Sequence, residues 1–287
     1  MGIRVAFQGE IGAFSEEAAL AMYPDAEPVA FPTFELVFEG TIEGAADRAI
    51  IPIENSLHGS VHTNYDLLQE YELTIVGEYN LRIRHHLMAK AGTAREDVRR
   101  ILSHPQALGQ CRHYLRKEFG HAEMTPAYDT AGAAKMVAEA AEMDLAAIAS
   151  EKAASEYGLQ ILASGIETNR QNFTRFLALS REPERAGNPQ TGSARKTSIV
   201  YSMRANVPGA LFKSLAVFAL RDLDLFKIES RPLIGSPGQY LFYLDLEGDA
   251  ETEPVRLALE HLREIAAYVK VLGSYPAAKR VAPIADA

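Results

Sequence analysis

The 287-residue sequence lacks several features by which proteins are commonly classified. It contains one cysteine, Cys111, so an internal disulfide bond is excluded. No apolar run of about 18 residues occurs, so no membrane span is predicted, and the N-terminus enters a strand pattern without the plan of a signal peptide. The net charge is −9 and no basic block is present, which argues against a nucleic-acid partner. We therefore expect a soluble, cytoplasmic protein with no nucleic-acid or membrane partner.

The hydrophobic pattern divides the chain into two parts. Segments typical of strands and helices alternate many times over residues 1–180, which predicts an α/β domain of two lobes with a cleft between them. Residues 181–196 are rich in Pro, Gly and charge, and we expect a linker there. Residues 197–275 show the β-α-β-β-α-β order of a ferredoxin-like domain, and residues 276–287 form a tail. The free sheet edge of such a domain favours pairing with a second copy, as a homodimer or homotetramer.

One short polar pair interrupts the apolar pattern near the end of the first part. Thr174 and Arg175 lie between Phe173 and Phe176, where an apolar run predicts a buried strand. A hydroxyl and a guanidinium at the mouth of a strand suit an anionic ligand in a cleft. Because side chains alternate along a strand, the two should point to opposite faces unless the backbone twists. The alternative is a strand whose polar start is only solvated.

Three further polar segments follow predicted strands. Residues 8–15 form a glycine-containing turn before a helix, residues 54–56 follow the strand at 48–53, and residues 103–106 begin another helix. Each segment suits a ligand at the end of a sheet, and each also fits a plain turn or helix cap. His58 and His62 have no third partner, so no metal site is predicted. Cys111 lies on an apolar helical stripe and is expected in the core rather than as a nucleophile.

In their order along the chain, these segments resemble the catalytic segments of the prephenate dehydratase family. The matching stretches are residues 9–15 (GEIGAFS), 52–56 (PIENS), 103–106 (SHPQ) and 174–176 (TRF). Residues 209–211 (GAL) and 229–232 (ESRP) resemble the regulatory ACT segments of the same enzymes. The resemblance implies a two-lobed catalytic domain like a periplasmic binding protein, followed by an ACT domain that binds phenylalanine between subunits. No chorismate mutase helix precedes the first strand, so the expected form is monofunctional. Where the family often has Asn-Leu-Thr-Lys, this chain has Asp224-Leu-Phe226-Lys, which alters the expected effector site.

The resemblance also implies an activity and a set of site residues. The expected reaction is the decarboxylating dehydration of prephenate to phenylpyruvate, a lyase step of phenylalanine biosynthesis that needs no cofactor or metal. Thr174 would be the catalytic residue, as a positioned hydrogen-bond donor to the leaving oxygen. The expected substrate-binding residues are Asn55, Ser56, Ser103, Gln106, Arg175 and Phe176. The expected phenylalanine-binding residues are Pro208, Gly209, Ala210, Leu211, Glu229, Ser230, Arg231 and Pro232. Two alternatives remain: an arogenate dehydratase, and a non-catalytic amino-acid sensor of the same fold.

Overall fold

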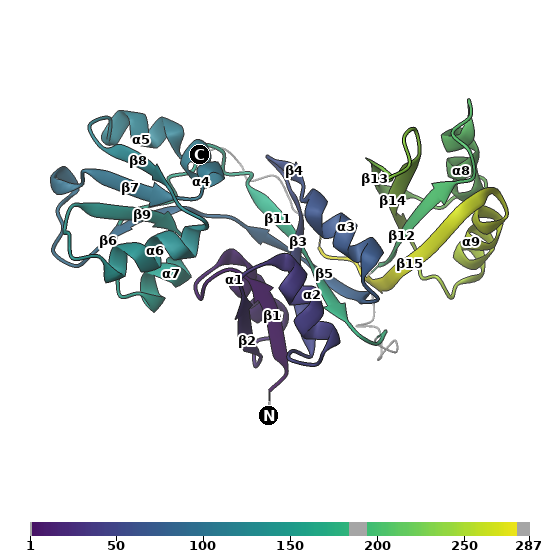
Figure 1. Ribbon diagram of the computed structural model, residues 1–287, viewed down its shortest axis with the longest axis horizontal. Coiled ribbons are helices and arrows are strands. Elements are labelled where there is room, and N and C mark those ends of the chain that lie inside the picture. Colours follow the sequence, from purple (N-terminus) through teal and green to yellow (C-terminus); the bar gives the residue numbers. More distant parts are fainter. Residues whose placement is uncertain (1, 184–193, 280–287) are drawn as a thin grey trace. The chain divides into compact units, whose positions relative to one another are not determined.

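The computed structural model describes residues 2–183 and 194–279, which fall into two compact units (Figure 1). Of these residues, 2–64 and 79–176 form the first unit, and 65–78 together with 177–183 and 194–279 form the second. Residues 65–78 therefore group with the C-terminal part, although the sequence pattern placed them inside a domain spanning 1–180. Most of the predicted linker, 181–196, lies outside the described residues, and Arg195 already begins a strand. No helix in the described ranges is long and apolar enough to span a membrane.

The N-terminal lobe is built on a parallel core of strands. Strand β1 pairs in parallel with β2 on one side and with β3 on the other, and the full sheet has the order β2-β1-β3-β11-β5, with β4 paired to β3. The division between the two units falls within helix α3 and strands β5 and β11. The elements are β1 (Arg4–Gln8), α1 (Phe14–Met22), β2 (Glu27–Phe31), α2 (Phe34–Ile42), β3 (Arg48–Asn55), β4 (Gly59–Ser60), α3 (His62–Glu70), β5 (Thr74–Arg82) and β11 (Phe173–Ser180).

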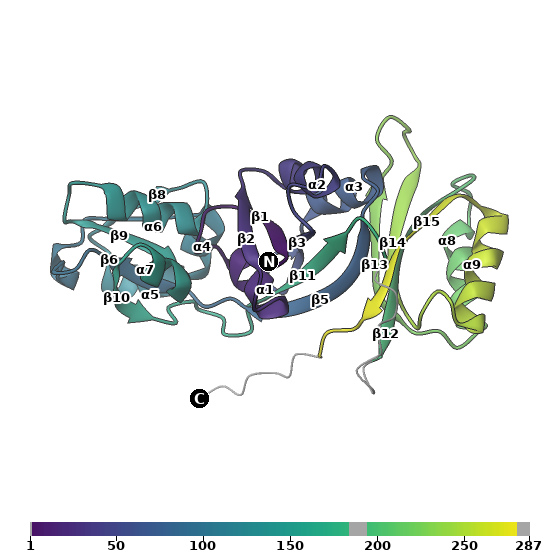
Figure 2. The same ribbon diagram turned by 90° about the horizontal axis from the view of Figure 1, so that it is seen from below.

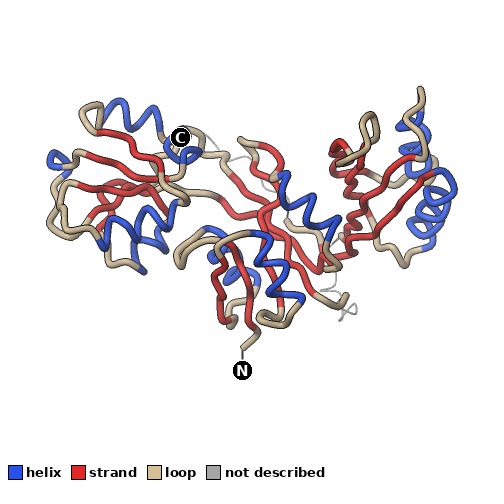
Figure 3. Tube along the Cα trace, viewed as in Figure 1, coloured by secondary structure: helices blue, strands red, loops and turns tan. Residues whose placement is uncertain are grey.

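The second lobe of the first unit has a five-stranded sheet of order β10-β6-β9-β7-β8. Figure 3 draws strands in red and helices in blue along the same trace. Three of its helices begin at side chains that accept hydrogen bonds from backbone N–H groups: Asp129 caps α6, Ser150 caps α7, and His104 caps α4. These caps fix polar side chains at the ends of strands, where the site is built. The elements are β6 (His86–Ala89), η1 (Arg95–Asp97), β7 (Arg100–Ser103), α4 (Pro105–Gln110), α5 (Arg112–Glu118), β8 (Glu123–Pro126), α6 (Thr130–Glu139), β9 (Leu145–Ala149), α7 (Glu151–Glu156) and β10 (Gln160–Ser164).

The second unit carries the predicted β-α-β-β-α-β order, and the expected α/β fold class is confirmed. Its antiparallel sheet has the order β13-β14-β12-β15, and helices α8 and α9 lie together on one face of it (Figure 2). Residues 65–78 hydrogen-bond to the same unit, since Tyr243 Oη donates to the Tyr65 carbonyl at 2.9 Å. The elements are β12 (Arg195–Met203), α8 (Ala210–Ala219), β13 (Leu225–Pro232), β14 (Tyr240–Glu247), α9 (Glu253–Ile265) and β15 (Ala266–Pro276).

Candidate active site

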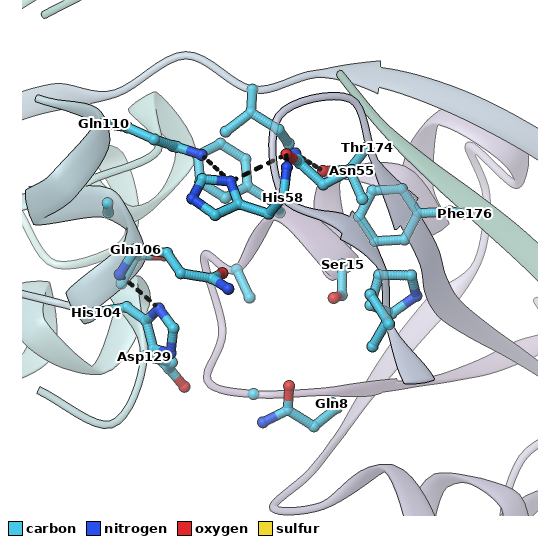
Figure 4. Close-up of a pocket in the computed structure, with 18 of the residues that line it drawn as sticks. Gln8, Ser15, Asn55, His58, His104, Gln106, Gln110, Asp129, Thr174 and Phe176 are labelled. Carbon is cyan, nitrogen blue, oxygen red and sulfur yellow. Dashed lines mark hydrogen bonds between the residues drawn. The ribbon is translucent and has the colours of Figure 1, made fainter. Parts of the chain in front are cut away.

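A cavity of about 400 Å³ lies within the first unit and takes its walls from both lobes (Figure 4). The N-terminal lobe contributes the loop after β1 and the end of β3. The second lobe contributes the start of α4 and the segment that caps α6, and β11 supplies Thr174 and Phe176. All four segments that carried the family resemblance therefore reach or approach one cavity. The carboxyl ends of strands gather at this edge of each sheet, which is where α/β proteins bind ligands.

The loop between β1 and α1 holds the two lobes together beside the cavity. Gly12 has φ +90°, and a Cβ on it would stand 2.7 Å from the Ala153 Cα, so only glycine permits this approach. Ser150 Oγ donates to the Gly12 carbonyl at 2.6 Å, and Tyr157 Oη donates to the Ile11 carbonyl at 2.8 Å. Lys135 Nζ lies 3.0 Å from a carboxylate oxygen of the loop residue Glu10. These contacts fix the glycine-containing turn to the second lobe, where the turn forms part of the cavity wall.

Thr174 is 9% exposed, and its hydroxyl is held by Asn55. Asn55 Nδ2 donates to Thr174 Oγ1 at 3.0 Å and to Asn172 Oδ1 at 2.9 Å. The Asn55 side-chain oxygen accepts from the backbone N–H groups of Leu57 and His58. Asn55 lines the cavity, but its hydrogen-bonding groups are used within the protein. It orients Thr174, and its predicted role as a substrate anchor has no free group to support it.

The same network continues into the second lobe through Gln110, the last residue of α4. Gln110 Oε1 lies 3.0 Å from Asn172 Nδ2 and 2.6 Å from His85 Nε2, and Gln110 Nε2 lies 3.1 Å from His58 Nδ1. Burial lowers the pKa of His85, which favours its neutral form. Sequence reasoning missed Gln110 and His85. Gln110 stands four residues after Gln106 on the same helix face, and this spacing was the signal that could have found it.

The structure separates the predicted substrate-binding residues into two groups. Asn55, Gln106 and Phe176 line the cavity with Thr174, whereas Ser56, Ser103 and Arg175 are not among its lining residues. Ser103 is fully buried and donates to the Ile148 carbonyl at 2.7 Å, so its hydroxyl serves the fold. Ser56 Oγ donates to the Gln171 carbonyl at 2.6 Å.

Arg175 lies between two residues of β11 that line the cavity, Thr174 and Phe176, and is not itself among the lining residues. The alternation of side chains along a strand accounts for this arrangement. The described lining contains no lysine or arginine. The Arg175 guanidinium that was expected to meet a substrate carboxylate is therefore not part of this lining.

Two titratable side chains of the second lobe face each other at the cavity wall. Asp129 caps α6, and burial raises the pKa of its carboxyl group. Burial has the opposite effect on His104, the cap of α4, and lowers the pKa of its imidazole. One oxygen of Asp129 has no hydrogen-bond partner among the described residues. Within those residues, no group of three or more His, Cys, Asp or Glu side chains is arranged to hold a metal ion.

The predicted effector residues lie in the second unit. Gly209 has φ +80° and precedes α8, so Pro208, Gly209, Ala210 and Leu211 lie at the start of this helix. Pro208 has no N–H group, and the Ala210 N–H donates to the Val207 carbonyl at 3.0 Å. Glu229, Ser230, Arg231 and Pro232 end strand β13. Arg231 differs from the expectation, because its guanidinium binds Asp66 at 2.8 and 2.6 Å and is already neutralised.

Two α/β lobes around a polar cavity, followed by a βαββαβ unit, define a two-lobed ligand-binding protein with an additional ferredoxin-like unit. The model of the family described as prephenate dehydratase matches residues 5–184. The chain belongs to this family. An arogenate dehydratase/prephenate dehydratase of Arabidopsis thaliana is 50% identical over 283 residues, which cover 96% of this chain and 73% of the relative.

Two solved structures are similar to this chain over nearly its whole length. A prephenate dehydratase from Arthrobacter aurescens in complex with L-Phe is 34% identical, with a TM-score of 0.88 and coverage of 99% of this chain and 93% of the other. A structure titled GqqA, a novel type of quorum quenching acylase, is 35% identical, with a TM-score of 0.87 and coverage of 96% and 98%. The prediction of a cytoplasmic protein is wrong on these comparisons, because three Arabidopsis thaliana relatives that each cover 96% of the chain are named as chloroplastic.

Proposed function

We propose that the chain converts prephenate to phenylpyruvate. In this reaction the bond between the ring and its carboxylate breaks and CO2 leaves. The electron pair enters the ring, the ring C–O bond breaks, and the hydroxyl departs as water after gaining a proton. The observation that supports the proposal is the Thr174 hydroxyl at the cavity wall. Its oxygen accepts from Asn55, so its own hydrogen is free to donate to the leaving oxygen. Phe176 and Phe14 supply apolar walls that exclude water from the departing carboxylate.

The direct test is incubation of the purified protein with prephenate. Phenylpyruvate is read from its absorbance at high pH, and turnover separates an enzyme from the amino-acid sensor of the same fold. A folded protein that forms no product from prephenate or arogenate would refute the proposal.

Arogenate is the second candidate substrate, because it carries an ammonium group where prephenate carries a keto group. The relatives named as arogenate dehydratases favour it, and so does the charge of the cavity, whose described lining includes Asp129 and no lysine or arginine. A carboxylate stabilises an ammonium group at short range. The ratio of kcat/KM for the two substrates, measured on one preparation, decides between them.

The 35% identical structure is described as an acylase. Acyl transfer differs from the dehydration proposed here, because it needs an activated nucleophile. Thr174 Oγ1 accepts from the Asn55 amide at 3.0 Å, and an amide cannot act as the base that would activate this hydroxyl as a nucleophile. An assay with an acylated homoserine lactone serves as the negative control for the dehydratase assay.

We further propose that phenylalanine regulates the enzyme through the second unit. Support comes from the L-Phe complex of the Arthrobacter aurescens structure and from the helix start at Gly209, where the helix dipole favours a carboxylate. A separate proposal concerns self-association. Strand β13 lies at the edge of its sheet, and its side chains Phe226 and Ile228 are exposed, which suits pairing with a second copy. Light scattering at micromolar concentration tests this proposed dimer or tetramer, and a monomer would contradict it.

A further inference from the structure

Asn172 is completely buried and does not line the cavity, yet it connects the hydrogen bonds of the two lobes. It lies between Asn55 of the N-terminal lobe and Gln110 of the second lobe, in bonds of 2.9 and 3.0 Å. An amide has one accepting and one donating end, so each bond constrains the direction of the next. The direction of the whole network can therefore be derived from any point at which it is fixed.

The backbone fixes the direction at Asn55. The N–H groups of Leu57 and His58 can only donate, and both point at the same Asn55 side-chain atom, at 3.0 and 3.1 Å. That atom must be the oxygen. The other end is therefore the amide nitrogen, whose two hydrogens meet Asn172 and Thr174 at 2.9 and 3.0 Å. Both contacted atoms must accept, so the Thr174 hydroxyl hydrogen is left for a ligand.

Asn172 passes this direction to Gln110. Because its oxygen accepts from Asn55, its nitrogen must donate, and the Gln110 atom at 3.0 Å must be oxygen. The same oxygen lies 2.6 Å from His85 Nε2, which must then carry a proton. Gln110 Nε2 is left to donate to His58 Nδ1 at 3.1 Å. The same Nδ1 lies 3.3 Å from Asn55 Oδ1, but the two lone pairs of that oxygen already accept from the backbone N–H groups of Leu57 and His58. We therefore infer that Nδ1 accepts from Gln110 and that the proton of neutral His58 sits on its Nε2.

We propose that Asn172 is a positioning residue that sets the orientation of Gln110 and the tautomers of His58 and His85 at the cavity wall. The proposal rests on the proposed dehydratase function for its effect on turnover, but its effect on the tautomers can be measured without substrate. In Asn172→Asp the new side chain has the same shape and accepts from Asn55, but its ionised form cannot donate to Gln110. The side-chain amide of Gln110 would then flip by about 180°, so that its nitrogen faces His85 and its oxygen faces His58. Both imidazoles would have to move their proton to Nδ1.

The experiment compares the full-length wild type, Asn172→Asp and Asn172→Leu. Nitrogen-15 NMR of the imidazoles reports the tautomers, with His58→Gln and His85→Gln used to assign the two signals among the eight histidines. We expect protons on Nε2 of both histidines in the wild type and on Nδ1 of both in Asn172→Asp. At neutral pH, kcat of Asn172→Asp should fall about tenfold while KM changes less.

A pH series separates this role from a merely structural one. When the carboxyl group introduced by Asn172→Asp is protonated, its hydroxyl can donate to Gln110, so activity of this variant relative to wild type should rise as the pH falls. Asn172→Leu has no such group and should show no rise. Asn64→Asp is the matched control, because Asn64 is also fully buried and donates to the Pro52 carbonyl at 2.7 Å, outside the network. It should lower the melting temperature and leave kcat and both tautomers unchanged.

Three outcomes would overturn the proposal. One is a proton on Nδ1 of either histidine in the wild type, a measurement that holds even if the variants fail to fold. The second is a folded Asn172→Asp that keeps both wild-type tautomers. The third is a loss of kcat that does not vary with pH and matches the loss in Asn172→Leu. A wild type without turnover on either substrate would refute the dehydratase function alone, because the tautomers remain measurable.

Discussion

Replacement of Thr174 by valine removes the hydroxyl while keeping the shape of the side chain. The hydroxyl is the group that we propose donates to the leaving oxygen, and loss of one such donor lowers kcat about 10²–10³-fold. Since the bond strengthens as charge develops on that oxygen, KM should change much less than kcat. Thr174→Ser keeps a hydroxyl and should retain part of the activity.

The structure also gives the effect of Thr174→Val on stability. Asn55 Nδ2 would keep its bond to Asn172 but lose its second partner in a partly buried site, which costs about 1 kcal/mol. Thr41→Val is the control, because Thr41 is also buried and donates to the Val37 carbonyl at 2.7 Å in helix α2. It should lower the melting temperature without changing kcat. The assay is phenylpyruvate or phenylalanine formation with a parallel thermal melt. A folded Thr174→Val with near-normal kcat would refute the catalytic assignment.

Three further predictions concern other parts of the chain. Phenylalanine should inhibit turnover, and its binding should raise the melting temperature by mass action. Gly209→Val should lose both responses. The control Gly235→Val should keep them, because Gly235 has a similar φ of +77° and open space around it. Burial raises the pKa of Asp129, so the carboxylate that would attract an ammonium group becomes protonated as the pH falls through that raised pKa. On acidification, kcat/KM for arogenate should therefore fall relative to kcat/KM for prephenate. Asp129→Asn should abolish this dependence on pH. Cys111 is fully buried and its thiol pKa is raised, so iodoacetamide should label it only after unfolding, and fast labelling of the native protein would contradict its place in the core.

The sequence by itself determined the α/β class, the order of the C-terminal unit and the segments that approach the cavity. Periodicity of 2 and 3.6 residues reports which face of an element is buried, and this is a local property. It placed Cys111 in the core, and strand alternation raised the caution that Thr174 and Arg175 point to opposite faces, although both were predicted as site residues; of the two, only Thr174 lines the cavity. The family likeness rested on short segments in order, and the match over residues 5–184 agrees with it.

Tertiary structure decided which polar side chains are free to meet a ligand. The sequence pattern treated Ser103 and Asn55 alike, as polar groups at strand ends. The structure uses the Ser103 hydroxyl for the carbonyl of Ile148 and the Asn55 amide for Thr174, across separations of 45 and 119 residues. Gln110 and Asn172 meet across 62 residues only because the two lobes pack against each other. A hydrogen bond depends on the position of its partner in space, and local pattern carries no record of that position, so the network around Thr174 could be derived only from the folded chain.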